Sequence, residues 1–329
     1  MSKPRILVAR AIFPEVVERL AQHFEVESNP DDVIWSPHEL AARLADKDGA
    51  FTTGSQRIDA ALIAAAPRLK IVANMAVGYN NFDVDAMTAA GVQGTNTPDV
   101  LTETTADFGF ALLMATARRL TESEHFLRAG KWTTWRYDMF AGSDIHGSTL
   151  GIIGMGRIGQ GIAKRGAHGF GMNVVYHNRS RLAPALEAEC KARYVEKDEL
   201  LRTADHVVLV LPYTPASHHT MGAAELALMK PTATLINIAR GGIVDDAALA
   251  VALHERRSAA EGRTLGKGEM GRLAELITER SARRSPHIAS ATVPTRLAMA
   301  NLAADNLIAF FDGRGPLTPV NQPAAMRSA

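Results

Sequence analysis

Residues 149–167 read TLGIIGMGRIGQGIAKRGA, and this stretch carries the pattern that decides the fold. An apolar, strand-like run is followed by three glycines in the spacing G-x-G-x-x-G and then by a helical pattern. In a dinucleotide-binding unit, Gly154 would make a tight turn, Gly156 would let a pyrophosphate approach the backbone, and Gly159 would let the helix pack closely on the sheet. The helix N-terminus would then point free N–H groups at the phosphates. The alternative is a glycine turn that binds no ligand.

The alternation of strand-like and helix-like runs continues on both sides of this stretch. Short β-branched runs alternate with amphipathic stretches, which predicts parallel sheets with helices on their faces. The expected strands include 5–9, 49–54, 69–76, 206–212 and 233–240, and the expected helices include 14–24, 59–67, 102–130 and 295–311.

This order predicts an α/β protein with two doubly wound parallel-sheet domains. We expect a Rossmann cofactor domain over residues 101–289, inserted in a flavodoxin-like substrate domain formed by residues 1–100 and 290–329. We expect the active site in the cleft between the two domains.

Composition limits the class of protein. The chain has 329 residues, of which 47 % are apolar and 22 % charged, as in globular proteins. A net charge of +1 without a basic stripe argues against nucleic acid and anionic membranes as partners. The single cysteine, Cys190, excludes an internal disulfide and fits a reducing compartment. With neither a signal-peptide core nor a long apolar run, the sequence predicts a cytoplasmic protein.

The residues after the next expected strand bear on the choice of cofactor. An NAD site would place Asp or Glu about 20 residues beyond the glycines, to bond the ribose 2′-OH. This chain instead has Asn178, Arg179, Ser180 and Arg181. Two arginines and a serine could hold a 2′-phosphate, so we expect a preference for NADP(H), with NAD(H) as the other cofactor. The alternative is that these are ordinary solvated loop cations.

Two further motifs supply candidate catalytic residues. Arg240 ends the expected strand 233–240 and is followed by two glycines. Ligands of open α/β sheets bind at this edge, where an arginine can clamp a carboxylate or polarise a carbonyl. His287 follows a proline in the run SPHIAS; one histidine among eleven carries little weight by itself.

Taken together, these motifs resemble the D-isomer-specific 2-hydroxyacid dehydrogenase family over nearly the whole chain. Within the family, the chain is similar to the glyoxylate/hydroxypyruvate reductases, including those that also reduce 2-ketogluconate. The resemblance implies NAD(P)H-dependent reduction of a small 2-keto acid to the D-2-hydroxy acid. The motifs that carry it are NMAVGYNNFDVDA (74–86), TPDVLTETTAD (97–107), LGIIGMGRIG (150–159), VVLVLPYTPASHHTMG (207–222), NIARGGIVDDAAL (237–249) and PHIASAT (286–292).

The resemblance also implies roles for individual residues. His287 would protonate the substrate C2 oxygen, and Glu269 would bond the other imidazole nitrogen and favour the imidazolium. Arg240 would hold the keto acid, whose carboxylate would also meet the backbone N–H groups of Val77 and Gly78; the alternative for these two is a plain strand-to-helix turn. The other residues implied are Asn80 for the substrate, and Thr105, Arg157, Ile158, Leu211, Pro212 and Ala239 for the cofactor.

Residues 130–147, GKWTTWRYDMFAGSDIHG, are rich in large side chains but have no period that would give them a core of their own. Exposed together, these side chains would form an apolar patch larger than soluble monomers usually tolerate. The resemblance implies an arm that wraps a partner subunit, so we expect a homodimer in which Trp135 or Met139 helps to set substrate size. The alternative is an arm folded back on its own domain.

The stretch 262–285 departs from the family pattern, which runs A-G-L-D-V-F-x-x-E-P. Gly262 and Glu269 match the Gly and Glu of this pattern, but Arg263 and Thr264 replace its Leu and Asp. The run RSARRS before the histidine is too charged for a buried strand. We favour a reading-frame slip that is later reversed. The alternative is a real local rewrite in which residues 269–284 form a surface helix.

This departure also supports a second functional hypothesis. A chain altered at 262–285 could be a catalytically impaired cofactor-binding protein, such as a nucleotide sensor or a corepressor-like protein. Arg240, Glu269 and His287 argue for the enzyme.

Overall fold

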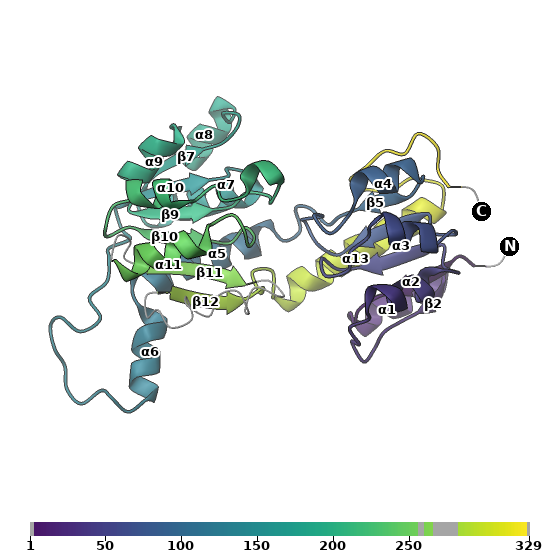
Figure 1. Cartoon of the computed structure of the whole chain (residues 1–329), viewed down its shortest axis with the longest axis horizontal. Helices are drawn as coiled ribbons and strands as arrows, with labels where there is room; N and C mark the ends of the chain where they lie inside the picture. Colours follow the sequence, from purple (N-terminus) through teal and green to yellow (C-terminus); the bar gives the residue numbers. More distant parts are fainter. Residues whose placement is uncertain (1–2, 256–259, 266–281, 328–329) are drawn as a thin grey trace. The chain divides into compact units, whose positions relative to one another are not determined.

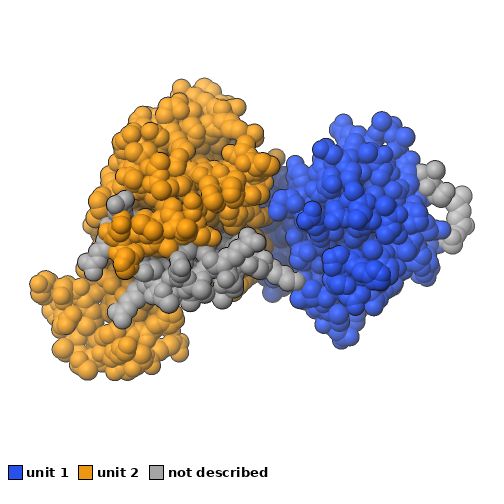
Figure 2. Space-filling model, in the orientation of Figure 1, with its two compact units in different colours: residues 1–101, 292–329 blue, residues 102–291 orange. Residues whose placement is uncertain are grey.

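The computed structural model describes residues 3–255, 260–265 and 282–327, and the chain divides into two compact units. Unit 1 comprises Met1–Leu101 and Thr292–Ala329, and unit 2 comprises Thr102–Ala291 (Figure 2). Each unit is built on its own parallel sheet with helices on both faces (Figure 1). The expected α/β class with two doubly wound parallel sheets is confirmed.

Unit 1 has five strands in the order β2-β1-β3-β4-β5. This is the flavodoxin-like order. One face packs on α1 and α13, and the other packs on α2, α3 and α4. The strands are β1 Arg5–Val8, β2 Glu25–Glu27, β3 Gly49–Thr52, β4 Ile71–Asn74 and β5 Gln93–Thr95. The helices are α1 Pro14–His23, α2 Pro37–Leu44, α3 Ala60–Ala65, α4 Val84–Ala89 and α13 Val293–Phe311.

Unit 2 has seven strands in the order β12-β11-β10-β9-β6-β7-β8. The order reverses beside β6, as in a Rossmann fold. Helices α5 and α7 cover one face, and α9, α10 and α11 cover the other. The strands are β6 Thr149–Ile153, β7 Asn173–His177, β8 Ala192–Tyr194, β9 His206–Leu209, β10 Thr234–Asn237, β11 Ala260–Leu265 and β12 Ala282–Pro286. The helices are α5 Thr102–Ala117, α6 Leu120–Arg128, α7 Arg157–Lys164, α8 Pro184–Cys190, α9 Lys197–Thr203, α10 Ala223–Leu228 and α11 Asp246–His254.

The single helix expected over 102–130 is wrong, because the chain forms α5 and α6 with a break between them. Arg119 has a left-handed backbone with φ of 54°, which interrupts a right-handed helix. The carbonyl oxygen of Ala117, the last residue of α5, accepts a hydrogen bond from the amide of Ser143 at 2.9 Å. The returning end of the 130–147 stretch therefore caps α5, a long-range contact that helical periodicity does not reveal.

Part of the stretch that departs from the family pattern is regular strand. Strand β11 pairs in parallel with β10, and β12 pairs with β11 as the last strand in the order. The hypothesis of a helix over 269–284 is wrong at its carboxyl end, since 282–284 belong to β12, while 269–281 lie outside the described residues. A Cβ on Gly262 would lie 2.5 Å from Thr116 Oγ1, so α5 packs directly on the strand there.

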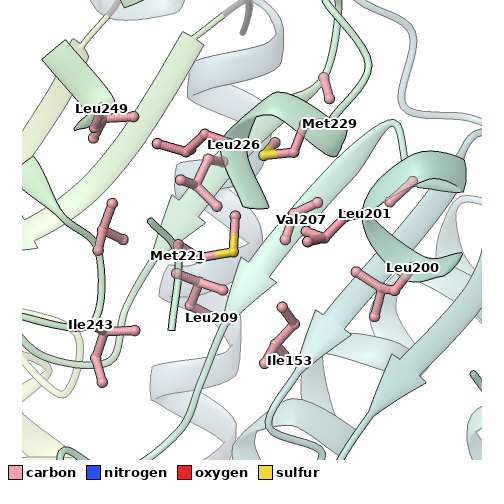
Figure 3. Close-up of a cluster of buried hydrophobic side chains, with 14 of the residues drawn as sticks. Ile153, Leu200, Leu201, Val207, Leu209, Met221, Leu226, Met229, Ile243 and Leu249 are labelled. Carbon is pink, nitrogen blue, oxygen red and sulfur yellow. The ribbon is translucent and has the colours of Figure 1, made fainter. Parts of the chain in front are cut away.

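A cluster of buried apolar side chains anchors the loops that follow β9 and β10 (Figure 3). Met221 and Ile243, which come from those loops, pack with Leu209 and Ile153 of the sheet, and Met221 and Ile243 are fully buried. Burying a side chain of this size stabilises a fold by about 1.5–3 kcal/mol. Both loops are therefore held by the core rather than left free at the surface. None of the described helices combines the length and the apolar character needed to cross a bilayer.

Candidate active site

The glycine-rich turn joins β6 to α7. Gly154 has φ of +103°, and a Cβ there would lie 2.2 Å from the carbonyl oxygen of Val210. A Cβ on Gly159 would lie 2.4 Å from the carbonyl oxygen of Gly154, so α7 approaches the turn too closely for a side chain. Gly156 differs, because a Cβ there would meet no atom within 4 Å. Gly154 and Gly159 are therefore required by the fold, whereas Gly156 leaves open space at the start of the helix.

The N-terminus of α7 is suited to an anion. Gly156 is the N-cap residue and supplies no side-chain cap. The N–H groups of a helix's first turn have no partner within the helix, and the helix dipole adds a partial positive charge there. Asn178 steadies the turn from the end of β7, since its Oδ1 accepts from the amide of Met155 at 2.9 Å. The arrangement fits the pyrophosphate of a dinucleotide.

The two arginines beyond β7 lie in different environments. Arg181 donates to both carboxylate oxygens of Glu187 at 2.8 Å, and this pairing holds the pKa of Glu187 below its usual value. Tyr176 also donates to Glu187, at 2.7 Å. Arg179 and Ser180 are exposed, and their side chains bond no residue that the structure describes. Arg179 is therefore available to a ligand, whereas Arg181 already has a carboxylate partner.

The other expected cofactor residues lie along the same part of unit 2. Leu211 and Pro212 follow β9, and the carbonyl oxygen of Pro212 accepts from Ser217 Oγ at 2.9 Å. Thr105 is buried on α5. On α7, Ile158 is half-buried and Arg157 is exposed.

Arg240 lies just beyond the carboxyl end of β10 and is held by its neighbours. Asn237 Oδ1 accepts from the amide of Ala239 at 3.0 Å, and Asn237 Nδ2 donates to the carbonyl oxygen of Arg240 at 3.3 Å. The guanidinium of the half-buried Arg240 donates to the carbonyl oxygen of Ala239 at 2.8 Å. Asn237 thus fixes the turn that carries the arginine.

A cluster of aromatic and imidazole rings packs on the two glycines after Arg240. Gly242 has φ of +77°, and a Cβ there would lie 3.0 Å from Tyr213 and 3.3 Å from His218. The hydroxyl of Tyr213 is 3.1 Å from His218 Nδ1, and the rings of His218 and His219 stack at 3.8 Å. The amide of His219 donates to the carbonyl oxygen of Gly242 at 2.8 Å. The loop after β9 therefore clamps the loop after β10.

His287 follows β12 directly and is exposed. Because all strands of this sheet are parallel, the residues that follow β6, β7, β9, β10 and β12 emerge at one edge. Strands β10 and β12 are separated by β11 alone, so the two strands run about 10 Å apart. Arg240 and His287 therefore share an edge with the glycine turn. Glu269, the expected partner of His287, lies outside the described residues.

In unit 1, Val77 and Gly78 follow β4 at the carboxyl edge of that sheet. Asn96 Nδ2 donates to the carbonyl oxygen of Val77 at 2.8 Å, and Asn74 Nδ2 donates to that of Gly78 at 3.1 Å. Asn80 is exposed. The loop is therefore held by side chains from two neighbouring strand ends, which a plain turn does not need.

The arm, residues 130–147, extends from the end of α6 (Figure 1). It includes Trp135 and carries exposed aromatic side chains. Trp132, Trp135 and Tyr137 are 55 %, 76 % and 88 % exposed. Phe140 is half-buried and packs edge-on against Phe126, with ring centroids 5.2 Å apart. Only the end of the arm is thus packed on its own unit within the described residues.

One buried histidine lies outside the candidate site. His206 on β9 is fully buried; its Nδ1 is 2.7 Å from Thr234 Oγ1, and its Nε2 is 3.0 Å from the carbonyl oxygen of Asp144. Burial lowers its pKa. This histidine joins the base of the arm to the sheet and has a structural role.

Four residues of the site were not identified from the sequence: Asn74, Asn96, Tyr213 and Asn237. Asn237 could have been found, because it immediately precedes the arginine turn that it bonds. Asn74 is also local, because it ends β4 and bonds Gly78 in the loop that follows. Asn96 and Tyr213 act across contacts between the ends of neighbouring strands, for which the sequence holds no local signal.

Comparison with known proteins gives consistent results. A family model described as "D-isomer specific 2-hydroxyacid dehydrogenase, NAD binding domain" matches residues 110–289, which lie within unit 2. A glyoxylate reductase from Thermococcus gammatolerans is 47 % identical over 324 residues, covering 97 % of this chain and 96 % of that protein.

Solved structures agree with this match. The NADPH-dependent glyoxylate/hydroxypyruvate reductase of Sinorhizobium meliloti, in complex with NADP and malonate, has a TM-score of 0.86 at 35 % identity and covers 100 % of both chains. A glyoxylate reductase from Paecilomyes thermophila has a TM-score of 0.87 at 31 % identity, covering 97 % of this chain and 99 % of that one.

Proposed function

Since the chain belongs to the D-isomer-specific 2-hydroxyacid dehydrogenase family, we propose that it reduces glyoxylate and hydroxypyruvate to their D-2-hydroxy acids, with 2-ketogluconate as a further candidate substrate. The observation that carries the proposal is the shared sheet edge in unit 2, where the glycine turn, Arg240 and His287 emerge together. Unit 2 would be the cofactor domain and unit 1 the substrate domain. The presence of both Arg240 and His287 favours an enzyme over an impaired cofactor-binding protein.

Each residue has a defined part in the proposed reaction. Arg240 would bind the keto acid through its carboxylate and carbonyl, which orients the C2 carbon and stabilises developing negative charge on oxygen. The N–H groups of Val77 and Gly78 would receive the same carboxylate. The reduced nicotinamide supplies the hydride when it is bound. His287 would donate a proton to the C2 oxygen, and Glu269 would keep the imidazole protonated.

The test is turnover of NADPH with glyoxylate and hydroxypyruvate. The substitution His287→Asn should lower kcat by about 10²–10⁴-fold, the usual contribution of a positioned acid, while the Kd for NADPH is retained. His125→Asn, at an exposed position on α6, is the matched control and should behave as wild type. Wild-type protein without turnover would refute the proposed function, and near-normal kcat in His287→Asn would refute the role of His287.

For the cofactor, we propose a preference for NADP(H) over NAD(H). The exposed Arg179 and Ser180 support it, because a 2′-phosphate can accept charge-assisted hydrogen bonds from both. The wild-type protein should show a lower KM for NADPH than for NADH. Equal use of the two cofactors would contradict the preference.

For assembly, we propose a homodimer in which the arm covers a partner subunit and Trp135 or Met139 helps to set substrate size in the partner's site. The exposed Trp132, Trp135 and Tyr137 support it, since such aromatic residues are enriched in interface cores. Light scattering at micromolar concentration should give twice the 35.4 kDa chain mass, and a stable mass of one chain would exclude the dimer. The single, buried Cys190 fits the cytoplasm as the compartment.

A further inference from the structure

The loop after β4 has its backbone carbonyl groups fastened one after another. The carbonyl oxygen of Ala76 accepts from the amide of Thr97 at 2.9 Å. That of Val77 accepts from Asn96 Nδ2 at 2.8 Å, and that of Gly78 accepts from Asn74 Nδ2 at 3.1 Å. Three consecutive peptide groups are therefore held through their oxygen atoms.

Fixing the oxygen of a peptide group also fixes its N–H. A trans peptide is planar, and its C=O and N–H point in opposite directions. The N–H groups of Val77, Gly78 and Tyr79 are thus directed away from the atoms that hold the carbonyls. None of the three donates to an acceptor among the residues that the structure describes. A row of free, oriented N–H groups of this kind is suited to an anion.

We propose that Asn96 and Asn74 are positioning residues that hold these N–H groups ready for the substrate carboxylate. The inference rests on the proposed function, in which Val77 and Gly78 receive that carboxylate. An amide is required because its Nδ2 donates to a carbonyl, whereas an ionised carboxylate of the same shape can only accept. Asn74 is fully buried, and its Oδ1 has no hydrogen-bond partner among the described residues. The hydrogen bond from its Nδ2 to the carbonyl oxygen of Gly78 therefore accounts for an amide at this buried position.

Asn96 is the better residue to change, because its backbone is fastened independently of its side chain. The amide of Asn96 donates to the carbonyl oxygen of Thr318 at 3.2 Å, and Thr318 Oγ1 donates back to the carbonyl oxygen of Asn96 at 2.5 Å. Thr318 is itself bonded to Asn306 of α13. The half-buried side chain of Asn96 can therefore be shortened while its backbone stays in place.

The experiment compares Asn96→Ala and Asn96→Asp with wild type. Loss of one hydrogen bond that orders the loop should raise the KM for glyoxylate and weaken inhibition by oxalate, each by about ten-fold, with a smaller change in kcat. The Kd for NADPH, measured by fluorescence, should stay within about two-fold, since the altered contact serves the carboxylate alone. Asn96→Asp should be the weaker variant at pH 8, because its carboxylate cannot donate to Val77 and repels the substrate.

A pH profile separates positioning from a merely structural role. As the pH falls toward about 4.5, a growing fraction of the introduced carboxyl group, whose ordinary pKa is about 3.9, becomes protonated, which gives it a donor and removes its charge. The kcat/KM of Asn96→Asp should then recover relative to that of Asn96→Ala. Asn29→Asp is the matched control, since the amide of Asn29 holds the carbonyl oxygens of Ala9 and Val33 instead. It should lower the melting temperature while leaving the KM for glyoxylate unchanged.

The outcomes are separable. Folded Asn96 variants with wild-type KM and oxalate inhibition, or with no relative recovery at low pH, would overturn the inference while the proposed function stands. If wild type lacks glyoxylate turnover but oxalate binding, measured by calorimetry with NADP bound, still weakens in the variants, the proposed function fails and the positioning role stands. Wild-type protein that does neither would overturn both.

Discussion

Two loops in this protein are proposed to present backbone N–H groups to an anion, and they are built differently. In unit 2, the turn 154–159 uses glycines and the first turn of α7, so the N–H groups are left over by the helix itself. In unit 1, the loop 76–79 precedes no such helix turn. Thr97, Asn96 and Asn74 hold its carbonyls, and the N–H groups of residues 77–79 have no acceptor among the described residues. The first device is local in sequence, and the second is assembled from two neighbouring strand ends, those of β4 and β5.

The difference explains what each loop tolerates. A helix N-terminus keeps its geometry as long as the helix forms, so it is disturbed mainly by side-chain atoms that clash with its neighbours. A loop held by hydrogen bonds keeps its geometry only while each donor is present, so it is disturbed mainly by the loss of a donor. Substitutions that add bulk should therefore damage the turn in unit 2, and substitutions that remove a donor should damage the loop in unit 1.

The largest effect is expected for Gly154→Ala. The left-handed backbone and a Cβ 2.2 Å from the carbonyl oxygen of Val210 should together lower the free energy of unfolding by about 2–5 kcal/mol. Gly147→Ala is the matched control: its φ is also positive, at +71°, but a Cβ there has no neighbour within 4 Å. It should cost only about 1–2 kcal/mol. Urea denaturation measures both, and equal losses would show that sterics do not govern the turn.

Gly156→Ala should separate folding from binding. A Cβ at this position meets no protein atom, so stability should change by less than about 1 kcal/mol. The same Cβ would enter the space through which a pyrophosphate approaches, so the Kd for the dinucleotide should rise about 10- to 100-fold. Calorimetric titration with NADPH and a melting curve give the two numbers. Unchanged affinity would mean that the cofactor does not approach this N-terminus.

The two arginines beyond β7 test how unit 2 distinguishes NADPH from NADH. Arg179→Ala should raise the KM for NADPH by about ten-fold and leave that for NADH unchanged, because a charged hydrogen bond contributes about 1.5–3 kcal/mol. Arg181→Ala should have a smaller effect, since Arg181 is already bonded to Glu187. Steady-state kinetics of both variants gives the KM values for NADPH and NADH that test this ranking. The reverse ranking would show that Arg181 leaves Glu187 when the cofactor binds.

The smallest effect concerns the dependence of stability on pH, which should differ between the two units. Burial lowers the pKa of His206 below 6.5, so below that pH the unfolded chain binds more protons than the folded one. Stability from this residue is therefore complete above about pH 6.5 and declines as the pH falls, by at most about 1.4 kcal/mol per pH unit. In unit 1, Arg10 holds the pKa of Asp32 below its usual value, so that pair weakens only in stronger acid.

Melting curves at pH 7.5 and 5.5 test whether His206 contributes to the loss of stability in acid. Wild type should lose more stability between these pH values than His206→Gln, which has no proton to gain. His38→Gln, at an exposed position in unit 1, should follow wild type. A His206→Gln protein with the full wild-type pH dependence would assign the acid sensitivity to another group.

Much of unit 2 could be predicted from the sequence, because its signals are local. A strand, three glycines at fixed spacing and a helix must form a tight turn with a helix N-terminus at a sheet edge, and the steric demands at Gly154 and Gly159 agree with that pattern. The stretch 260–286 could not be predicted, although β11 and β12 form there. Its pairing is decided by the neighbouring β10 and by the contact of Gly262 with α5.

The sequence alone therefore determined the fold class, the glycine turn and the residues that follow each strand, because period and spacing act over a few residues. The tertiary structure decided which side chains hold those residues in place. Asn74 and Asn96 are 22 positions apart in the chain and meet at one loop because β4 and β5 are neighbours in the sheet. Arg179 and Arg181 look equivalent in sequence, yet Glu187 binds only the second among the described residues. Such contacts depend on strand order and helix packing, which place distant residues within hydrogen-bond reach.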